Sequence, residues 1–536
     1  MYMCGIAGII GLDASEEKLK ELLKSIVHRG EDSHQYEIGE IEGVGFFGTH
    51  RLGIVDESQG MQPIVSADKK VQCVFNGEIY NYKSIRKILD ENYHIDTQCD
   101  SEIVLYAYLY WGDDFVKYLD GMFAIAIFDA TKNKLLLARD PLGIKSLYYS
   151  KEKGNIKFAS EIKSLANDDD VKKILEIKPG TVWINDKSIR FYTLQNFSKS
   201  KENNSIGKFC QLKKCLTRVV AKHIPEMSYE IACLLSGGID SSIVTLLASK
   251  FCPNIVAYTL AAPNTASEDI KSAKELCEKL NIKHVIVTPC IEEMKEFYLN
   301  FGVYMTESFE TTLIRNAVSY YFLCAQVAKD GFKFCLNGEG ADELFGGYDF
   351  VMEAPESIRD NMIWYSLSII HKSYLQMADR ASMFATLEAR VPYMNEELVS
   401  YCLGLPADFR IVNNKNKASL REIFKEDLPL NILQRRKVGM NEGAGFGKNL
   451  PTDSIYCSAV KEYYAKDSAA YKDDLKECEI KKFEHNIYLD LDNLEEIYNF
   501  AKYSKLNYLK FEGGRDRLQL NTKLNVNFIP PNLFRT

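Results

Sequence analysis

Short apolar runs separated by turn residues dominate roughly the first third of the chain. The runs at 71–75, 123–128 and 135–138 have the length and composition of β-strands. Two longer stretches, at roughly 15–28 and 101–111, are predicted to be helices. Strands interleaved with helices in this way indicate an α+β layer structure.

The pattern changes after a polar segment at 198–205, which has nothing to bury and is predicted to be a linker. Apolar strands are expected at 231–235 and 255–258, each followed by a helix, the first from Ile239 and the second from Ser267. Continuous apolar strands between amphipathic helices are typical of a parallel sheet covered on both faces. This part of the chain is therefore expected to be an α/β domain.

A chain of 536 residues is too long for one ordinary domain. We predict a first domain at 1–195, a linker at 196–207, a second domain at 208–510 and a tail at 511–536. The second domain has further strand-like runs at 284–287 and 333–336, and is otherwise mainly helical from about residue 300.

Charge and composition narrow the class of function. The formal net charge of −8 argues against a nucleic-acid surface and favours small-molecule chemistry. Without an uninterrupted stretch of 18 apolar residues or a signal-peptide pattern, the protein is expected to be cytoplasmic. The 14 cysteines are scattered without a CxxC pair, which favours free thiols over a disulfide framework or a zinc site.

A glycine-rich loop, SGGIDSS at 236–242, lies between a predicted strand and a helix. Backbone N–H groups and the helix dipole both face an anion at such a point, which suits phosphate. The loop lacks the lysine of a P-loop, and Asp240 beside phosphate requires a cation, for which Mg²⁺ is the simplest choice. The alternative is a tight turn with a capping serine.

Two further clusters carry charge. The segment NGEGADELFGGY at 337–348 also follows a strand, so its carboxylates and the glycine-rich loop are expected to face one crevice. These carboxylates can coordinate Mg²⁺ or handle a proton, unless they only form an exposed acidic helix start. The segment RRKVG at 435–439 offers cations to phosphate, although basic triplets are usually solvated surface.

Cys4, near the amino end, is a candidate nucleophile, because a cysteine with a free α-amine carries its own base. Met1, Tyr2 and Met3 precede it, so this chemistry depends on processing. Tyr2 is too bulky a second residue for ordinary methionine removal, and we therefore expect translation to start at Met3. The alternative is a small residue inside a strand.

With these motifs in this order, the chain resembles the B-type glutamine-hydrolysing asparagine synthetases over roughly residues 1–450. The resemblance implies an Ntn-hydrolase αββα sandwich that releases ammonia from glutamine. A PP-loop domain of the adenine nucleotide α-hydrolase type, with a parallel sheet and extra helices, is expected to follow. That domain would activate aspartate with ATP and Mg²⁺, giving β-aspartyl-AMP and pyrophosphate, before ammonia attacks. A homodimer is also implied.

For the first domain, the resemblance implies that Cys4 is the nucleophile and that Asn76 and Gly77 stabilise the oxyanion. It implies glutamine contacts at Arg51, Leu52, Gly53, Ile54, Val55, Asn76, Gly77, Glu78 and Asp100. Arg51 would hold the glutamine carboxylate and Asp100 its ammonium. The alternatives are an Asn-Gly hairpin turn and a helix cap at Asp100. A chain that keeps residues 1–3 should have a silent glutaminase and use free ammonia.

For the second domain, the resemblance implies ATP contacts at Leu234, Ser236, Gly237, Gly238, Asp240, Ser241, Leu260, Asn337 and Gly338. Asp240 and Asp342 are the expected Mg²⁺ ligands. Glu339 and Lys437 are the expected catalytic residues, with Glu339 required for adenylate formation. The segments at 388–392 and 417–421 are expected to support the site.

The chain departs from the family pattern at several positions. Asn337 stands where serine is usual, PYMN at 392–395 loses a carboxylate, the segment 307–316 follows the pattern only in part, and Glu31 replaces a proline. Two alternatives therefore stay open. One is a related amidotransferase that amidates another carboxylate, such as a sugar acid or a peptide-like metabolite. The other is a homologue that binds nucleotide or glutamine without turnover.

Overall fold

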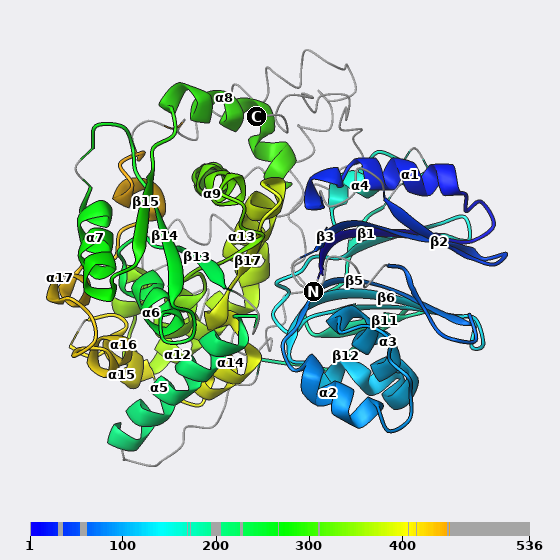
Figure 1. Cartoon of the computed structure of the whole chain (residues 1–536), viewed down its shortest axis with the longest axis horizontal. Helices are drawn as coiled ribbons and strands as arrows, with labels where there is room; N and C mark the ends of the chain where they lie inside the picture. Colours follow the sequence, from blue (N-terminus) through cyan, green and yellow to red (C-terminus); the bar gives the residue numbers. More distant parts are fainter. Residues whose placement is uncertain are drawn as a thin grey trace. The chain divides into compact units, whose positions relative to one another are not determined.

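The computed structural model describes residues 2–30, 36–53, 62–168, 170–171, 173–194, 205–225, 229–265, 267–308, 311–405, 407–413, 415–447 and 450. Contacts within this part divide it into two compact units, the first ending at Thr193 and the second beginning at Leu194. Both are drawn in Figure 1. Most of the expected linker, the tail at 511–536 and Glu31 lie outside the described residues.

The first unit combines strands and short helices. Its strands are β1 (Tyr2–Ile10), β2 (Glu37–Ile41), β3 (Gly45–Gly53), β4 (Ile64–Val65), β5 (Val71–Ile79), β6 (Gly121–Asp129), β7 (Lys134–Arg139), β8 (Tyr148–Glu152), β9 (Asn155–Ala159), β10 (Leu175–Glu176), β11 (Thr181–Ile184) and β12 (Lys187–Arg190). Its α-helices are α1 (Glu16–Lys24), α2 (Tyr82–Leu89), α3 (Asp100–Trp111) and α4 (Ile162–Ala166).

Alternating side chains on the central strands produce four layers. On β6, Phe123, Ile125 and Ile127 face a core shared with α2 and α3, whereas Ala124 and Ala126 face a second core shared with β1, β3 and β9. Helices α1 and α4 cover the other face of those strands. The expected αββα sandwich is therefore confirmed, and Figure 1 shows its layers.

The second unit contains a five-stranded sheet whose paired strands are all parallel. In spatial order its strands are β15 (Lys283–Val287), β14 (Asn254–Leu260), β13 (Glu230–Leu234), β16 (Phe334–Leu336) and β17 (Glu388–Arg390). The predicted parallel sheet is confirmed, and β17 is an addition to it. Sequence pattern missed β17 because its charged side chains do not look like a buried strand.

An internal ion pair explains how β17 is buried. Arg390 Nε donates to Glu388 Oε1 at 2.5 Å, and Arg390 Nη1 donates to the His223 carbonyl at 2.8 Å. The Arg390 guanidinium also lies over the Phe334 ring, 4.6 Å from its centroid. Pairing and hydrogen bonding together allow two charged side chains inside the unit.

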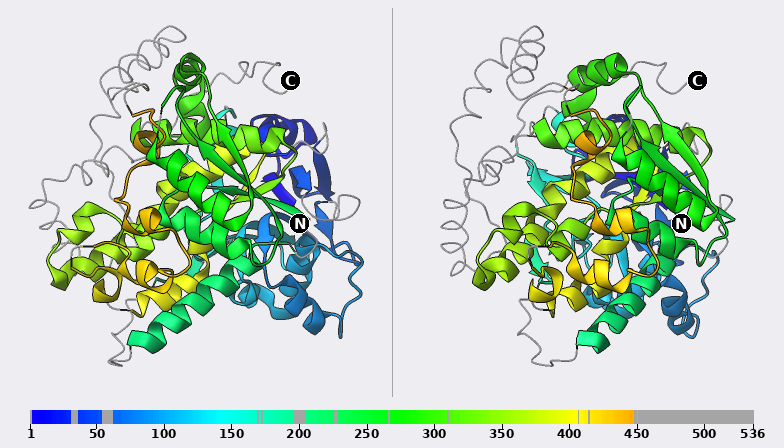
Figure 2. Two further views of the ribbon diagram at one scale, coloured as in Figure 1. Left: turned by 60° about the vertical axis from the view of Figure 1, so that its left-hand side comes forward. Right: turned by 90° about the vertical axis from the view of Figure 1, so that its left-hand side faces the viewer.

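Helices make up most of the rest of the second unit. They are α5 (Ser205–Lys222), α6 (Ile239–Ala248), α7 (Glu268–Leu280), α8 (Ile291–Thr306), α9 (Thr311–Lys329), α10 (Ala341–Phe345), α11 (Asp349–Met352), α12 (Glu356–Ile369), α13 (Tyr374–Phe384), α14 (Glu396–Leu403), α15 (Ala407–Arg410), α16 (Ala418–Ile423), α17 (Leu430–Gln434) and α18 (Met440–Gly443). Figure 2 shows the later ones, in yellow and orange, beside the sheet. No described helix is long and apolar enough to cross a membrane.

Candidate active sites

The second unit has a cavity of about 190 Å³ that is lined by the loops following β13 and β16. Both loops leave the carboxyl ends of neighbouring parallel strands, where open α/β sheets bind ligands. Of the residues expected to bind ATP or Mg²⁺ or to act in catalysis, the cavity is lined by Leu234, Ser236, Gly238, Asp240, Ser241, Leu260, Asn337, Gly338, Glu339, Asp342 and Lys437. Three motifs that are distant in the sequence therefore meet at one place.

At two glycines in and beside the glycine-rich loop, neighbouring backbone atoms lie too close to leave room for a side chain. Gly237 has φ +68°, and a Cβ there would lie 2.7 Å from the Asp269 carbonyl oxygen. A Cβ on Gly338 would lie 2.8 Å from the Ser241 nitrogen. Gly237 does not line the cavity but allows the turn. The N-cap of α6 is Gly238, without a side-chain cap, so the alternative of a capping serine is wrong.

A buried lysine links the two expected Mg²⁺ ligands. Lys417 Nζ lies 2.5 Å from Asp240 Oδ2 and 2.5 Å from Asp342 Oδ1, and its side chain is 3% exposed. Lys437 forms an ion pair with the second oxygen of Asp342. Burial disfavours the Asp342 carboxylate, but Lys417 and Lys437 outweigh it and lower the pKa of Asp342.

These carboxylates suit a magnesium ion that keeps other oxygen ligands. Asp240 Oδ1 is buried and has no hydrogen-bond partner among the described residues, so a lone pair is left for a cation. The described residues contain no cluster of three or more His, Cys, Asp or Glu side chains suited to a metal. A metal held by Asp240 and Asp342 would therefore need phosphate or water oxygens as well, which is the usual situation for Mg²⁺.

Two glutamates near this cluster ionise with difficulty. Burial, followed by the neighbouring Glu343, raises the pKa of Glu339 to about 8. Burial and Asp342 likewise raise the pKa of Glu343 to about 7, and Tyr348 Oη donates to Glu343 Oε1 at 2.6 Å. Glu339 lines the cavity, whereas Glu343 does not, so Glu339 is the one placed to meet a ligand.

The cavity also contains residues that sequence reasoning missed. Asp269, in the first turn of α7, forms an ion pair with Arg435, whose Nη1 donates to the Ser236 carbonyl at 3.1 Å. Arg435, which was expected to offer its positive charge to phosphate, is thus partly neutralised by Asp269. Helix α9 adds Asn316 and Tyr320, and the four-residue spacing that puts them on one helical face was a usable signal.

In the first unit, backbone register brings the expected glutamine-site segments together. Cys4 pairs with Arg51 across β1 and β3, and Tyr2 pairs with Gly77 across β1 and β5. The side chains of Cys4 and of residues 51–53 lie outside the described part of the structure, as do Ile54 and Val55. Their roles stay predictions.

Asn76 and Gly77 lie inside β5, so the hairpin-turn alternative is wrong. Asn76 and Glu78 are buried. Gly77 has φ +151°, and a Cβ there would lie 2.0 Å from the Met122 carbonyl oxygen, so this position requires glycine. The Asp100 carboxylate accepts the Ile79 N–H at 2.9 Å, which ties α3 to the end of β5.

Asp100 is therefore not a simple cap of its own helix. The N-cap of α3 is Cys99, and Asp100 is the first helical residue. No described contact tests the ammonium role expected of Asp100, which stays a prediction.

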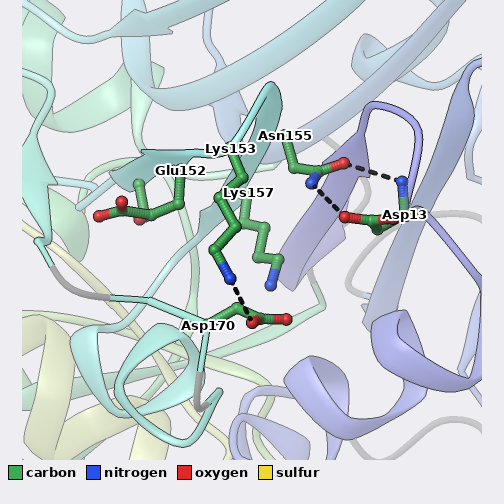
Figure 3. A pocket seen from close by; sticks show the side chains of 7 residues that line it. Asp13, Glu152, Lys153, Asn155, Lys157 and Asp170 are labelled. Atoms are coloured by element: carbon green, nitrogen blue, oxygen red, sulfur yellow. Dashed lines mark hydrogen bonds and ion pairs between the residues drawn. The ribbon is translucent and has the colours of Figure 1, made fainter.

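The first unit has a smaller cavity of about 40 Å³, which is lined by none of the expected site residues. Asn155 and Asp13 exchange two hydrogen bonds there, each of 3.0 Å. Figure 3 shows these bonds and an ion pair between a lysine and Asp170. That ion pair joins Lys153 Nζ to Asp170 Oδ1 at 3.7 Å. None of the expected site residues lines this cavity, so we assign no site to it.

The buried His50 gives the first unit a pH-dependent stability. Burial lowers the pKa of His50 to about 4 from its ordinary value of 6.5, and Nε2 donates to the Leu23 carbonyl at 2.9 Å. The neutral ring's contribution is fully present above pH 6.5 and is lost as the pH falls towards 4. We expect His50 alone to lower the free energy of unfolding by about 3 kcal/mol over that interval.

Urea denaturation at a series of pH values measures this drop, and two variants identify its source. His50→Gln should remove the share of the dependence that comes from His50, while His28 and His223, whose pKa values burial also lowers, keep theirs. His94→Gln should leave the dependence unchanged because the His94 side chain is 92% exposed. An equal slope in His50→Gln and the unsubstituted protein would contradict the assignment.

The chain matches two families of protein domains. Residues 3–189 match the family described as glutamine amidotransferase domain, and residues 211–368 and 353–452 match asparagine synthase. A probable asparagine synthetase [glutamine-hydrolyzing] of Schizosaccharomyces pombe is 30% identical and aligns over 83% of this chain and 85% of its own. Asparagine synthetase B [glutamine-hydrolyzing] of Escherichia coli is 30% identical, with 83% of each chain covered. The nodule asparagine synthetase of Pisum sativum is 28% identical, over 87% and 80%.

Proposed function

Because this chain belongs to the family of glutamine-hydrolysing asparagine synthetases, we propose that it makes asparagine from aspartate, ATP and glutamine. The observation that carries the proposal is the cavity in which the loops after β13 and β16 meet Lys437. Backbone donors, carboxylates and a cation lie together there, as activation of a carboxylate by a nucleotide requires.

In the synthetase reaction, a β-carboxylate oxygen of aspartate attacks the α-phosphorus of ATP. The bond from that phosphorus to the bridging oxygen breaks, and pyrophosphate leaves. The loop at 236–242 offers N–H groups to the phosphates, and Lys437 stabilises the charge that develops on them. Leu234 and Leu260 form an apolar part of the cavity that suits the adenine ring.

Ammonia then attacks the acyl carbon of the adenylate, and AMP leaves. The attacking nitrogen must lose a proton, which the departing phosphate or solvent can take. We assign Glu339 to the earlier step, adenylate formation, because it lines the cavity and its pKa of about 8 lets it exchange a proton near neutral pH. Mg²⁺ held by Asp240 and Asp342 would supply charge neutralisation for the phosphates. Lys417, which pairs with both carboxylates, keeps them close together in the protein itself.

In the glutaminase reaction, the Cys4 sulfur attacks the amide carbon of glutamine while its free α-amine takes the thiol proton. Asn76 and Gly77 donate to the oxyanion, and the proton passes to the departing ammonia. Water then hydrolyses the thioester to glutamate. The rigid placement of Gly77 within β5 supports this role, because oxyanion donors act best when they are fixed in advance.

The lost carboxylate at position 395 does not favour a different acceptor. Asn395 is the N-cap of α14, where its side chain accepts the Glu397 N–H at 3.1 Å, and it does not line the described cavity. A short carboxylate or amide fits such a cap equally well. Aspartate therefore remains the acceptor we propose.

An acceptor panel tests the proposal. With amide-labelled glutamine, Mg²⁺ and ATP, we expect labelled asparagine, AMP and pyrophosphate from aspartate alone. Sugar acids and peptide-like carboxylates serve as the comparison. Product from one of them and none from aspartate would reject the assignment, and nucleotide binding without any product would identify a homologue without turnover.

Assembly and domain limits are parts of the same proposal. We propose that residues 1–195 and 208–510 act as the glutaminase and synthetase domains of a cytoplasmic homodimer. Sedimentation equilibrium of the full chain measures its oligomeric state.

A further inference from the structure

Asn337, which stands where serine is usual, makes two hydrogen bonds from one buried side chain. Its Oδ1 accepts the Glu339 N–H at 2.9 Å, and its Nδ2 donates to the Tyr320 hydroxyl at 2.9 Å. A backbone N–H can only donate, so the amide oxygen must face Glu339. The amide nitrogen then has to face Tyr320, which accepts. A serine has no second polar atom with which to make this contact.

Tyr320 is itself firmly placed. It is 1% exposed on α9, and burial raises its pKa well above the ordinary value, so the phenol stays neutral. One turn earlier on the helix, Asn316 Oδ1 accepts from Asn441 Nδ2 at 2.6 Å, and Ser319 Oγ donates to Asn441 Oδ1 at 2.5 Å. These bonds fasten α9 to the segment around α18.

The Asn337 backbone is held as well. Its N–H donates to the Arg390 carbonyl at 3.1 Å, which joins the end of β16 to β17. The side chain therefore connects a fixed strand end, a fixed helix and the loop that carries Glu339. Without the bond to Tyr320, the amide could turn about its last side-chain torsion, because that torsion has only broad preferences.

We propose that Tyr320 is a positioning residue for the synthetase reaction: it holds the Asn337 amide, which holds the backbone of Glu339 at the cavity. The inference rests on the proposed role of Glu339 in adenylate formation. The inference also explains why asparagine can stand where serine is usual at position 337. The asparagine is held by a hydrogen bond to Tyr320, which the shorter serine side chain could not make.

The first test compares two neighbouring tyrosines in aspartate-dependent exchange of labelled pyrophosphate into ATP. Tyr320→Phe removes the hydroxyl that accepts from Asn337, and should lower kcat about tenfold while KM for ATP stays within about twofold. Tyr321→Phe is the matched control, because Tyr321 is also buried on α9 but packs against Phe297 and does not line the cavity. Its kinetics should be unchanged.

A double-mutant cycle separates positioning from general damage to the fold. In Asn337→Ser, the serine hydroxyl can still accept the Glu339 N–H but does not reach Tyr320, so adding Tyr320→Phe should have no further effect on kcat. An equal loss in both backgrounds, a rise in KM alone, or an unchanged kcat in Tyr320→Phe overturns the proposal. Absence of exchange in the unsubstituted protein counts instead against the proposed function.

Discussion

Replacing Glu339 with glutamine should lower aspartate-dependent ATP–pyrophosphate exchange by at least about a hundredfold while leaving glutamine hydrolysis intact. The substitution keeps the size of the side chain and removes its charge and its capacity to accept a proton. Burial and Glu343 hold the pKa of Glu339 at about 8, so near neutral pH the group is poised to exchange a proton. Glutamine lacks that property at every pH.

Glu343→Gln is the matched control, because Glu343 is buried four residues away but does not line the cavity. Its carboxylate accepts the Tyr348 hydroxyl, and a glutamine oxygen can accept the same bond. We expect exchange within about tenfold of the unsubstituted protein, since the change reaches the cavity only through the charge near Glu339. Exchange in Glu339→Gln that matches Glu343→Gln would remove Glu339 from the chemistry.

Local pattern predicted those parts of the fold in which apolar residues decide the structure. The runs at 71–75 and 123–128 became β5 and β6, because alternating residues face two apolar cores. Helix α2 was missed although Tyr82, Ile85 and Leu89 have helical spacing and are buried. The spacing is present in the sequence, but α2 has only 8 residues, fewer than the window over which helical periodicity is distinctive.

The candidate site was predictable where it depends on loops that follow strands. The glycines and aspartates at 236–242 and 337–348 identify such loops from local sequence alone, without knowledge of the tertiary fold. The ion pairs were not predictable in this way. Lys417 meets Asp240 across 177 positions in the sequence, and Arg435 meets Asp269 across 166. Only the tertiary fold determines which lysine or arginine reaches a given carboxylate.

Replacing Cys4 with alanine should abolish glutamine-dependent asparagine synthesis, by a factor of about a thousand or more, and leave ammonia-dependent synthesis unchanged. The nucleophile is lost, but the cavity of the second unit is not altered. Parallel assays with glutamine and with ammonium salt measure both activities. Cys210→Ala, which removes an exposed thiol from α5, should leave both unchanged. Glutamine use that survives in Cys4→Ala would refute the assignment.

On the proposed mechanism, glutamine hydrolysis requires that the residues before Cys4 be removed. Tyr2 and Met3 continue β1, and Tyr2 pairs with Gly77, so they occupy backbone positions beside the expected oxyanion donor. They also place the Cys4 nitrogen in a peptide bond, where it cannot act as a base. We therefore expect protein that hydrolyses glutamine to begin at Cys4, and protein that begins at Met1 to use ammonia only. Intact-mass measurement on preparations assayed for both activities tests this, and glutamine hydrolysis by protein that retains residues 1–3 would overturn the mechanism proposed for the α-amine.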